Sequence, residues 1–182
     1  MARYVALLRG INVGGNNIIR MADLRACLEA DGFDNVRTYI QSGNVVFTGS
    51  GSSATLTARL ERTLSQEFGY EATVAVRSAR QLRAIVDGAP KGFGADRERY
   101  RSDVIFLMAP LTPARAIAAV PTREGVDRAW TGPGVLYFER LAARASQSRL
   151  SKIVSLPIYR SLTIRNWATT CKLLEMVETP LG

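Results

Sequence analysis

The chain has 182 residues, of which 47% are hydrophobic and 22% charged, and its net charge is +8. Such values are typical of one globular domain or of two small halves that share a core. No apolar run approaches the roughly 20 residues of a membrane helix, the two cysteines have no metal-ligand spacing, and histidine is absent. We therefore expect a cytoplasmic protein that has no metal, no other cofactor and no membrane partner.

The first half of the chain predicts the element order β-α-β-β-α-β. Met21, Leu24 and Leu28 recur at helical spacing, and Gly32 stands where a helix would end. Two β-rich runs are separated by Ser-Gly-Asn, which is typical of a hairpin. This order is that of the ferredoxin-like split unit. The expected strands are 4–8, 36–41, 45–47 and 72–76, and the expected helices are 21–30 and 54–68.

The second half predicts a similar order, β-α-β-β-α-α. A helix at 79–87 and a loop at 88–101 separate it from the first half. We therefore expect an α+β fold with an approximate structural repeat, antiparallel or mixed sheets, and halves 1–88 and 89–182 within one compact unit. The expected strands are 104–108, 126–130 and 135–139, and the expected helices are 113–119, 148–155 and 163–177.

Positive charge is concentrated near the C-terminus. Residues 140–174 contain seven Lys or Arg and no Asp or Glu, whereas the rest of the chain contains 17 basic and 16 acidic residues. In a helix at 163–177, Trp167 lies on an apolar face and should pack in the core, while the opposite face is cationic. An anion-binding surface and a merely solvated basic face both fit. The candidate anion-binding residues here are Arg149, Ser151, Lys152, Arg165, Asn166, Thr169 and Lys172.

A glycine-rich loop follows the first expected strand and precedes the first expected helix. Backbone N–H groups in such a loop, together with a nearby helix start, suit a phosphate or carboxylate. The loop lacks both the P-loop signature and the dinucleotide fingerprint, so a tight strand-to-helix connection is the alternative. Its candidate anion-binding residues are Arg9, Asn12, Gly14, Gly15 and Arg20.

The expected hairpin at 36–47 carries a polar face that includes an aromatic ring. Such a face could stack a nucleic-acid base, as some sheet-based RNA binders do. The alternative is a plain turn, because Gly and Asn tolerate unusual backbone angles. The candidate residues of this hairpin motif are Tyr39, Gln41, Ser42 and Asn44.

Three separate motifs resemble a bacterial family known as domain-of-unknown-function family 1697. They are Leu8-Arg-Gly-Ile-Asn-Val-Gly-Gly15, Tyr39-Ile-Gln-Ser-Gly-Asn-Val-Val-Phe47, and Thr163-Ile-Arg-Asn-Trp167 with Lys172-Leu173. The resemblance extends over nearly the whole chain. It implies an α+β fold of two intertwined ferredoxin-like halves, and it implies no established activity.

Three functions follow as hypotheses. The first is a non-catalytic module that binds a polyanion, such as nucleic acid or a phosphate-bearing ligand, through Arg149, Lys152, Arg165 and Lys172. The second is a small enzyme for a phosphorylated or carboxylated metabolite, with Asp23, Tyr39 or Lys152 as the proton-handling group. The third is a protein-interaction module.

Overall fold

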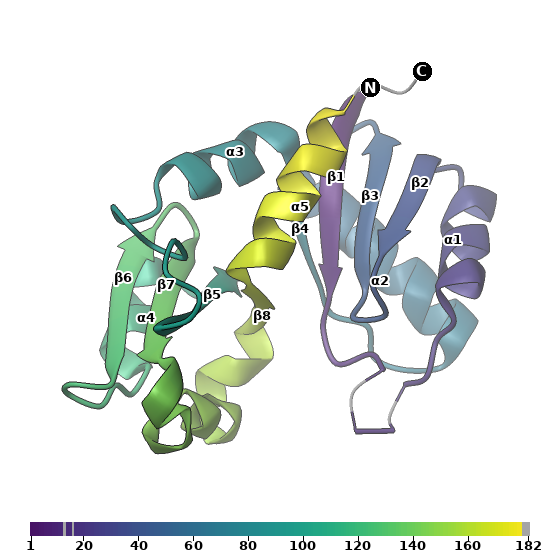
Figure 1. Cartoon of the computed structure of the whole chain (residues 1–182). Coiled ribbons are helices and arrows are strands. Elements are labelled where there is room, and N and C mark those ends of the chain that lie inside the picture. The colour runs from purple at the N-terminus through teal and green to yellow at the C-terminus, as the bar shows by residue number, and fades with distance from the viewer. Residues whose placement is uncertain (13, 16, 180–182) are drawn as a thin grey trace. The chain divides into compact units, whose positions relative to one another are not determined.

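A computed structural model describes residues 1–12, 14–15 and 17–179 (Figure 1). The chain divides into two compact units. The first comprises Met1–Arg83 together with the chain from Lys172 onward, and the second comprises Ala84–Cys171. The sequence places the division five residues later, after residue 88, and assigns the C-terminal segment to the second half.

The first unit contains a four-stranded antiparallel sheet with the strand order β2-β3-β1-β4. Tyr4, at the centre of this sheet, pairs with Phe47 on one side and with Ser78 on the other. Alternation along β1 sends every second side chain to the face that packs against two helices. The elements are β1 (Ala2–Leu8), α1 (Met21–Ala30), β2 (Asp34–Tyr39), β3 (Asn44–Gly49), α2 (Ser53–Phe68) and β4 (Val74–Ser78).

Helix α2 is the main cover of the first sheet. Leu56, Leu60 and Leu64 repeat every four residues and are at most 1% exposed, so each contributes about 1.5–3 kcal/mol of burial free energy. The Ser52 side chain caps the N-terminus by accepting a hydrogen bond from the Thr55 backbone N–H at 3.1 Å. No helix in the described part of the chain, α2 included, has the length and hydropathy of a membrane-spanning segment.

The second unit repeats this sheet. Its strand order, β6-β7-β5-β8, is that of the first sheet, and all of its pairings are antiparallel. Asp103 occupies the position of Tyr4, since it pairs with Phe138 on one side and Asn166 on the other. The predicted α+β class is thus confirmed, with two four-stranded antiparallel sheets. The elements are β5 (Tyr100–Leu107), α4 (Pro113–Ala119), β6 (Asp127–Gly132), β7 (Val135–Leu141) and β8 (Leu162–Asn166).

The predicted helix at 163–177 is wrong at its start. Residues Leu162–Asn166 form β8, and helix α5 begins only at Trp167 and ends at Glu178. Thr163 and Ile164 are β-branched and pair with β5, which outweighs the helical spacing of the apolar residues. The predicted order β-α-β-β-α-α therefore lacked a strand. Helix predictions at 79–87 (α3, Ala79–Asp87) and 113–119 (α4) match the structure.

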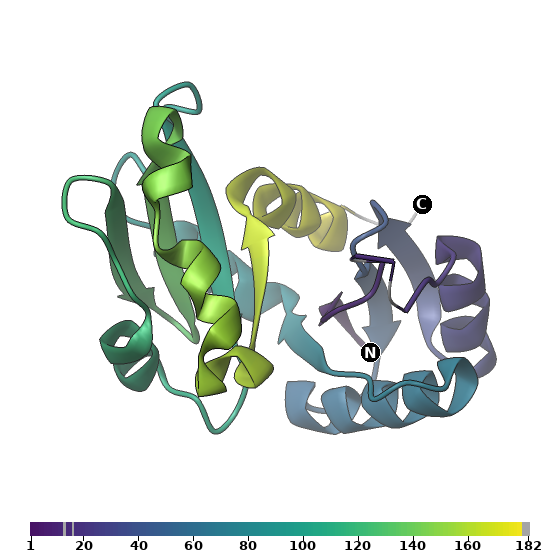
Figure 2. The ribbon, with the colours of Figure 1, turned by 90° about the horizontal axis from the view of Figure 1, so that it is seen from below.

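The predicted helix at 148–155 is also wrong, because this region consists of short 3₁₀ turns. They are η1 (Ala142–Gln147), η2 (Leu150–Ser155) and η3 (Pro157–Ser161), and they lie across the second sheet (Figure 2). Serine side chains here form hydrogen bonds with backbone groups that an α-helix would use for its own hydrogen bonds. Ser148 Oγ accepts from the Leu150 N–H at 3.2 Å, and Ser155 Oγ donates to the Lys152 carbonyl at 2.8 Å. Only Leu150 and Ile153 of these turns are buried.

Candidate functional site

The glycine-rich loop of the first unit is organised by Asn12. Its Nδ2 donates to the carbonyls of Ile19 and Gln41 at 2.9 and 2.8 Å, and its Oδ1 accepts from the Ile19 N–H at 2.8 Å. The Asn12 side chain therefore holds the loop together, which is a structural role. Gly14, Gly15 and Arg20 are exposed, Arg9 is half-buried, and Val13 and Asn16 lie outside the described residues.

The hairpin motif is held in a similar way. Asn44 is fully buried, and its Nδ2 donates to the Tyr39 carbonyl and to Ser42 Oγ at 3.1 and 3.0 Å. Gly43 has a φ of +72°, and a Cβ there would lie 2.7 Å from Ile11 Cδ1, so only glycine fits. The hairpin and the glycine-rich loop thus pack on each other, and the bond from Asn12 to the Gln41 carbonyl joins them.

The four candidate cations of the acid-free stretch lie in different surroundings. Arg165 lies on β8, is 8% exposed, and donates to Thr163 Oγ1 at 2.9 Å; burial lowers its pKa to about 10. Lys172 belongs to the first unit and forms an ion pair with Glu175 at 2.7 Å. Arg149, which directly precedes η2, and Lys152, which lies within η2, are both exposed. The helical spacing behind the prediction does not exist, because Arg165 lies on a strand.

Asn166 and Thr169 also have structural roles. Asn166 Oδ1 accepts a 2.7 Å hydrogen bond from the Thr169 backbone N–H, which caps the first turn of α5. Thr169 is buried. Trp167 is half-buried and packs against Phe93, with their ring centroids 5.1 Å apart in an edge-on arrangement.

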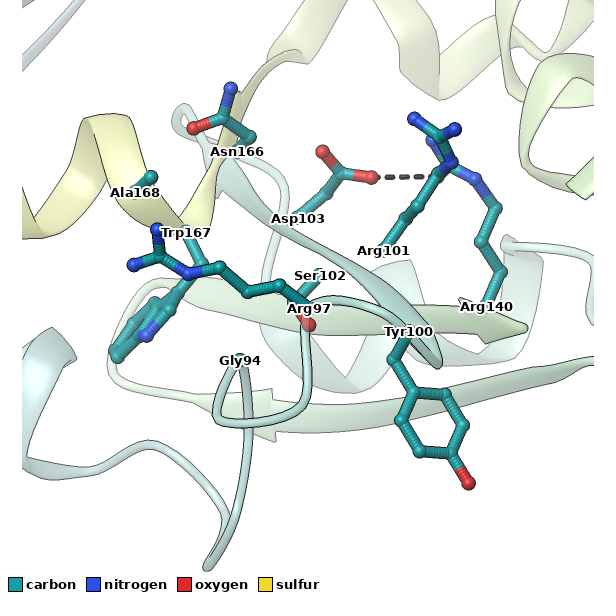
Figure 3. A pocket seen from close by; sticks show the side chains of 10 residues that line it. All are labelled: Gly94, Arg97, Tyr100, Arg101, Ser102, Asp103, Arg140, Asn166, Trp167 and Ala168. Atoms are coloured by element: carbon teal, nitrogen blue, oxygen red, sulfur yellow. Dashed lines mark hydrogen bonds and ion pairs between the residues drawn. The ribbon is translucent and has the colours of Figure 1, made fainter. Parts of the chain in front are cut away.

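The second unit contains a cavity of about 310 Å³ beside the first residues of β5. Strand β8 pairs with β5 only from Asp103 onward, so the edge of β5 is open on this side from Tyr100 to Ser102. The first turn of α5 forms the opposite wall (Figure 3). The lining residues are Gly94, Arg97, Tyr100, Arg101, Ser102, Asp103, Arg140, Asn166, Trp167 and Ala168.

Positive charge dominates this cavity, which holds three guanidinium groups and one carboxylate. Arg140 Nη1 donates to Asp103 Oδ2 at 2.6 Å, and the two side chains are 21% and 14% exposed. Burial raises the pKa of Asp103, although Arg140 and Arg101 act in the opposite direction. Within the described ranges, the guanidinium groups of Arg97 and Arg101 form no hydrogen bond or ion pair. The cavity therefore has about two positive charges in excess.

Glu139 fixes the wall of the cavity that carries Gly94. This carboxylate is 3% exposed and accepts hydrogen bonds from Ser102 Oγ at 2.7 Å and the Gly94 N–H at 3.2 Å. Arg128 forms an ion pair with the other oxygen of Glu139 at 2.6 Å. Gly94 has a φ of +70°, and a Cβ there would lie 2.1 Å from Trp167 Cδ1. These bonds pair the charges of Glu139 and Arg128 and hold the wall at Gly94 in place.

A second cavity, of about 420 Å³, adjoins the first and shares Arg101 and Arg140 with it. Its remaining lining comes from the 3₁₀ turns and β8 and is mainly apolar. These residues are Ala145, Ser148, Leu150, Ser151, Ile153, Val154, Tyr159 and Ile164. Ser151 is thus the one predicted anion-binding residue of η2 that reaches a cavity.

Sequence reasoning missed the centre of the site, Arg97, Arg101, Asp103 and Arg140. Residues 88–101 were expected to form a loop, although β5 begins at Tyr100. Arg101, Ser102 and Asp103 are three consecutive polar residues, so no alternation extended the expected strand back from Val104. Arg140 was visible as the first cation of the acid-free stretch, but its pairing with Arg101 across two strands depends on the sheet register.

Fold and site together define an α+β protein with two four-stranded antiparallel sheets of equal strand order and an arginine-lined cavity in the second. The chain belongs to the family described as "Protein of unknown function (DUF1697)", whose profile matches residues 1–137. The match includes Arg97, Arg101 and Asp103 and ends before Arg140. It confirms the family indicated by the three sequence motifs.

A solved structure shows the same fold. It is described as the conserved bacterial protein SP0830 from Streptococcus pneumoniae, and it is 29% identical to this chain with a TM-score of 0.85. The alignment covers 97% of this chain and 99% of that one. No curated protein matches the chain.

Proposed function

We propose that the second unit binds a small anionic ligand, bearing a phosphate or carboxylate group, in the arginine-lined cavity. The observation that carries this proposal is the excess of guanidinium groups around one open cavity of about 310 Å³. Arginine presents a planar set of N–H donors that matches both phosphate and carboxylate oxygens. The guanidinium groups of Arg97 and Arg101 form no hydrogen bond or ion pair in the described part of the chain, so their N–H donors are available to a ligand.

The surroundings of the cavity add to this attraction. Trp167 and Ala168 open helix α5, and the partial positive charge of a helix N-terminus favours an anion. The only carboxylate in the lining, Asp103, is already bound to Arg140. An anion in the cavity therefore meets more positive than negative charge in the lining.

A small ligand fits better than a polymer. Ligand cavities of roughly 300–1,000 Å³ are typical of small-molecule sites. The surface that would have followed a nucleic-acid backbone required Arg149, Lys152, Arg165 and Lys172 to converge, and Arg165 is buried. Nucleic acid remains an outcome that the experiment below would detect.

Isothermal titration with inorganic phosphate, a nucleoside monophosphate and a single-stranded oligonucleotide tests the proposal. Arg101→Gln should weaken binding by about tenfold or more, because a charge-assisted hydrogen bond contributes about 1.5–3 kcal/mol. The matched control is Arg115→Gln, an exposed arginine on α4 that lines neither cavity; it should change affinity less than about twofold.

Two results would contradict the proposal. One is the absence of binding of both small anions at low ionic strength. The other is oligonucleotide binding that is much tighter than monophosphate binding and equally sensitive to Arg101→Gln and Arg115→Gln, because this would indicate a diffuse basic surface.

A catalytic role is a second candidate, and one observation favours it. Asp103 is a largely buried carboxyl in the cavity wall with a raised pKa, and such groups serve as general acids or bases. Asp23, considered as a proton-handling residue from sequence, is exposed and pairs with Arg20 at 3.9 Å. Loss of turnover in Asp103→Asn with unchanged ligand affinity would support catalysis, once a substrate is found by screening phosphorylated metabolites.

A further inference from the structure

The two adjoining cavities of the second unit indicate what the rest of the ligand looks like. The first cavity carries an excess of positive charge, whereas the second is mainly apolar, and both are lined by Arg101 and Arg140. We infer that the ligand is a single-chain amphiphile, with its acidic head group at Arg101 and Arg140 and an aliphatic tail in the second cavity. This inference rests on the proposed function and specifies its ligand class.

The lining of the second cavity favours an aliphatic group. Leu150 and Ile153 form its buried floor, with 9% and 1% of their surfaces exposed. Val154, from the same turn, is 60% exposed and stands among the large apolar residues that the fold leaves in water. A tail lying against these side chains would remove apolar surface from water on both partners.

The polar groups of the second cavity are few and partly satisfied. Ser148 Oγ accepts a hydrogen bond from the Leu150 N–H at 3.2 Å, and Arg140 is bound to Asp103. Arg101 is the charged group in this lining whose side chain forms no hydrogen bond or ion pair with the described residues. The complementary ligand therefore has one anionic end that reaches Arg101, and no charge along the part that enters the cavity.

Volume also favours a tail over a solvent-filled space. The second cavity, at about 420 Å³, is larger than the first, at about 310 Å³. Small-molecule sites of this size bury most of a ligand's surface and are lined mainly by apolar side chains with a few polar groups that fix orientation. A bare phosphate would occupy the arginine boundary and leave the larger cavity unused.

A homologous series of ligands tests the inference. The probes are inorganic phosphate and the methyl, butyl and octyl phosphates, each below its micelle concentration, with octanol as the uncharged control. Affinity measured by isothermal titration should rise by roughly two- to fourfold per methylene, because a buried methylene contributes up to about 0.8 kcal/mol. Octanol should bind far more weakly than octyl phosphate.

Variants assign the tail to the second cavity. Ala145→Phe should fill it and abolish the chain-length dependence while inorganic phosphate still binds. Val154→Ser alters an exposed residue, so it should fold normally and reduce the gain from butyl to octyl phosphate. Arg101→Gln should weaken all phosphates alike, and Arg115→Gln should weaken none.

The outcomes separate this inference from the proposed function. If phosphate binds and depends on Arg101, but affinity does not change with chain length, the amphiphile is excluded and the anion site stands. If no phosphate binds at all, both fail. Binding to vesicles of phosphatidylglycerol without binding of monomeric octyl phosphate would also overturn the inference, in favour of a membrane surface.

Discussion

The two sheets share one architecture and differ at the positions that matter. Their strand orders are equal, and Tyr4 and Asp103 hold equivalent places in the register. In the first sheet, Ala2 pairs with Gly49, and Tyr4 stacks on Phe47 with ring centroids 5.6 Å apart. In the second, the same places hold Arg101 opposite Arg140 and Asp103 opposite Phe138. Uncharged residues of the first sheet, among them the buried Tyr4 and Gly49, thus correspond to charged residues in the second.

The elements that cover the two sheets also differ. Between β3 and β4 runs α2, an amphipathic helix of 16 residues with a continuous stripe of leucines. Between β7 and β8 run the three short 3₁₀ turns, which bury only Leu150 and Ile153. The weaker cover leaves the two cavities of the second unit at this place. The candidate site therefore lies where the second repeat departs from the first.

The largest effect is expected when the first sheet receives an arginine at Gly49, the position equivalent to Arg140 in the second sheet. Gly49→Arg should lower the free energy of unfolding by about 4 kcal/mol or more, because it buries an unpaired charge. A Cβ added at Gly49 would lie 3.4 Å from the Phe47 ring and 3.5 Å from Leu56, so a longer side chain would extend into these residues. Urea denaturation measures the loss.

Gly49→Ala is the matched control for this substitution. The contacts of its Cβ would be ordinary, so it should change stability by no more than about 1 kcal/mol. If Gly49→Arg were tolerated as well as Gly49→Ala, the first sheet would have room for charge. The contrast between the two covers would then be wrong.

Truncation of the covers should give the next largest effect. Leu60→Ala in α2 should cost about 3 kcal/mol, because it leaves a closed cavity under a rigid helix. Leu150→Ala in η2 should cost only about 1–2 kcal/mol, because Leu150 already borders an open cavity. Amide hydrogen exchange in β1 and β5 measures the loss of stability in each sheet separately. Equal losses would show that the turns cover their sheet as firmly as α2 does.

Sequence patterns predicted the repeat but not the place where it changes. The helices predicted at 54–68 and 113–119 are confirmed as α2 and α4, and local features begin them, the Ser52 cap and Pro113. The same reasoning failed at Thr163–Asn166, since these four residues fit a helical pattern but belong to an edge strand that pairs with β5. Tertiary pairing of this kind is invisible in a local window.

The candidate site was hidden for the same reason. Arg101 and Arg140 are far apart in sequence and meet only through the β5–β7 register. Charge counting pointed to the stretch 140–174, of which Arg140, Asn166, Trp167 and Ala168 line the first cavity. It could not separate these from Arg165, whose charge is buried.

The smallest predicted effect concerns the ion pair that replaces Tyr4 in the second sheet. Burial raises the pKa of Asp103, while Arg140 on β7 and Arg101 on β5 oppose the rise. Asn166 on β8 faces it as an uncharged neighbour. A carboxyl with a raised folded pKa stabilises the fold fully below its unfolded pKa of about 3.9. That contribution is lost as the pH rises through the folded pKa.

Asp103→Asn removes this titration and keeps the shape of the side chain. The stability of the native protein minus that of Asp103→Asn should therefore increase as the pH is lowered from 7 towards 4, and urea denaturation at several pH values measures it. The contributions of the other titrating groups are the same in both proteins, so they cancel in this stability difference. A difference that is constant or decreases on acidification would mean that the attraction of Arg140 outweighs burial. Asp103 would then be an ordinary ion-pair partner, and the case for it as a proton-handling residue would be lost.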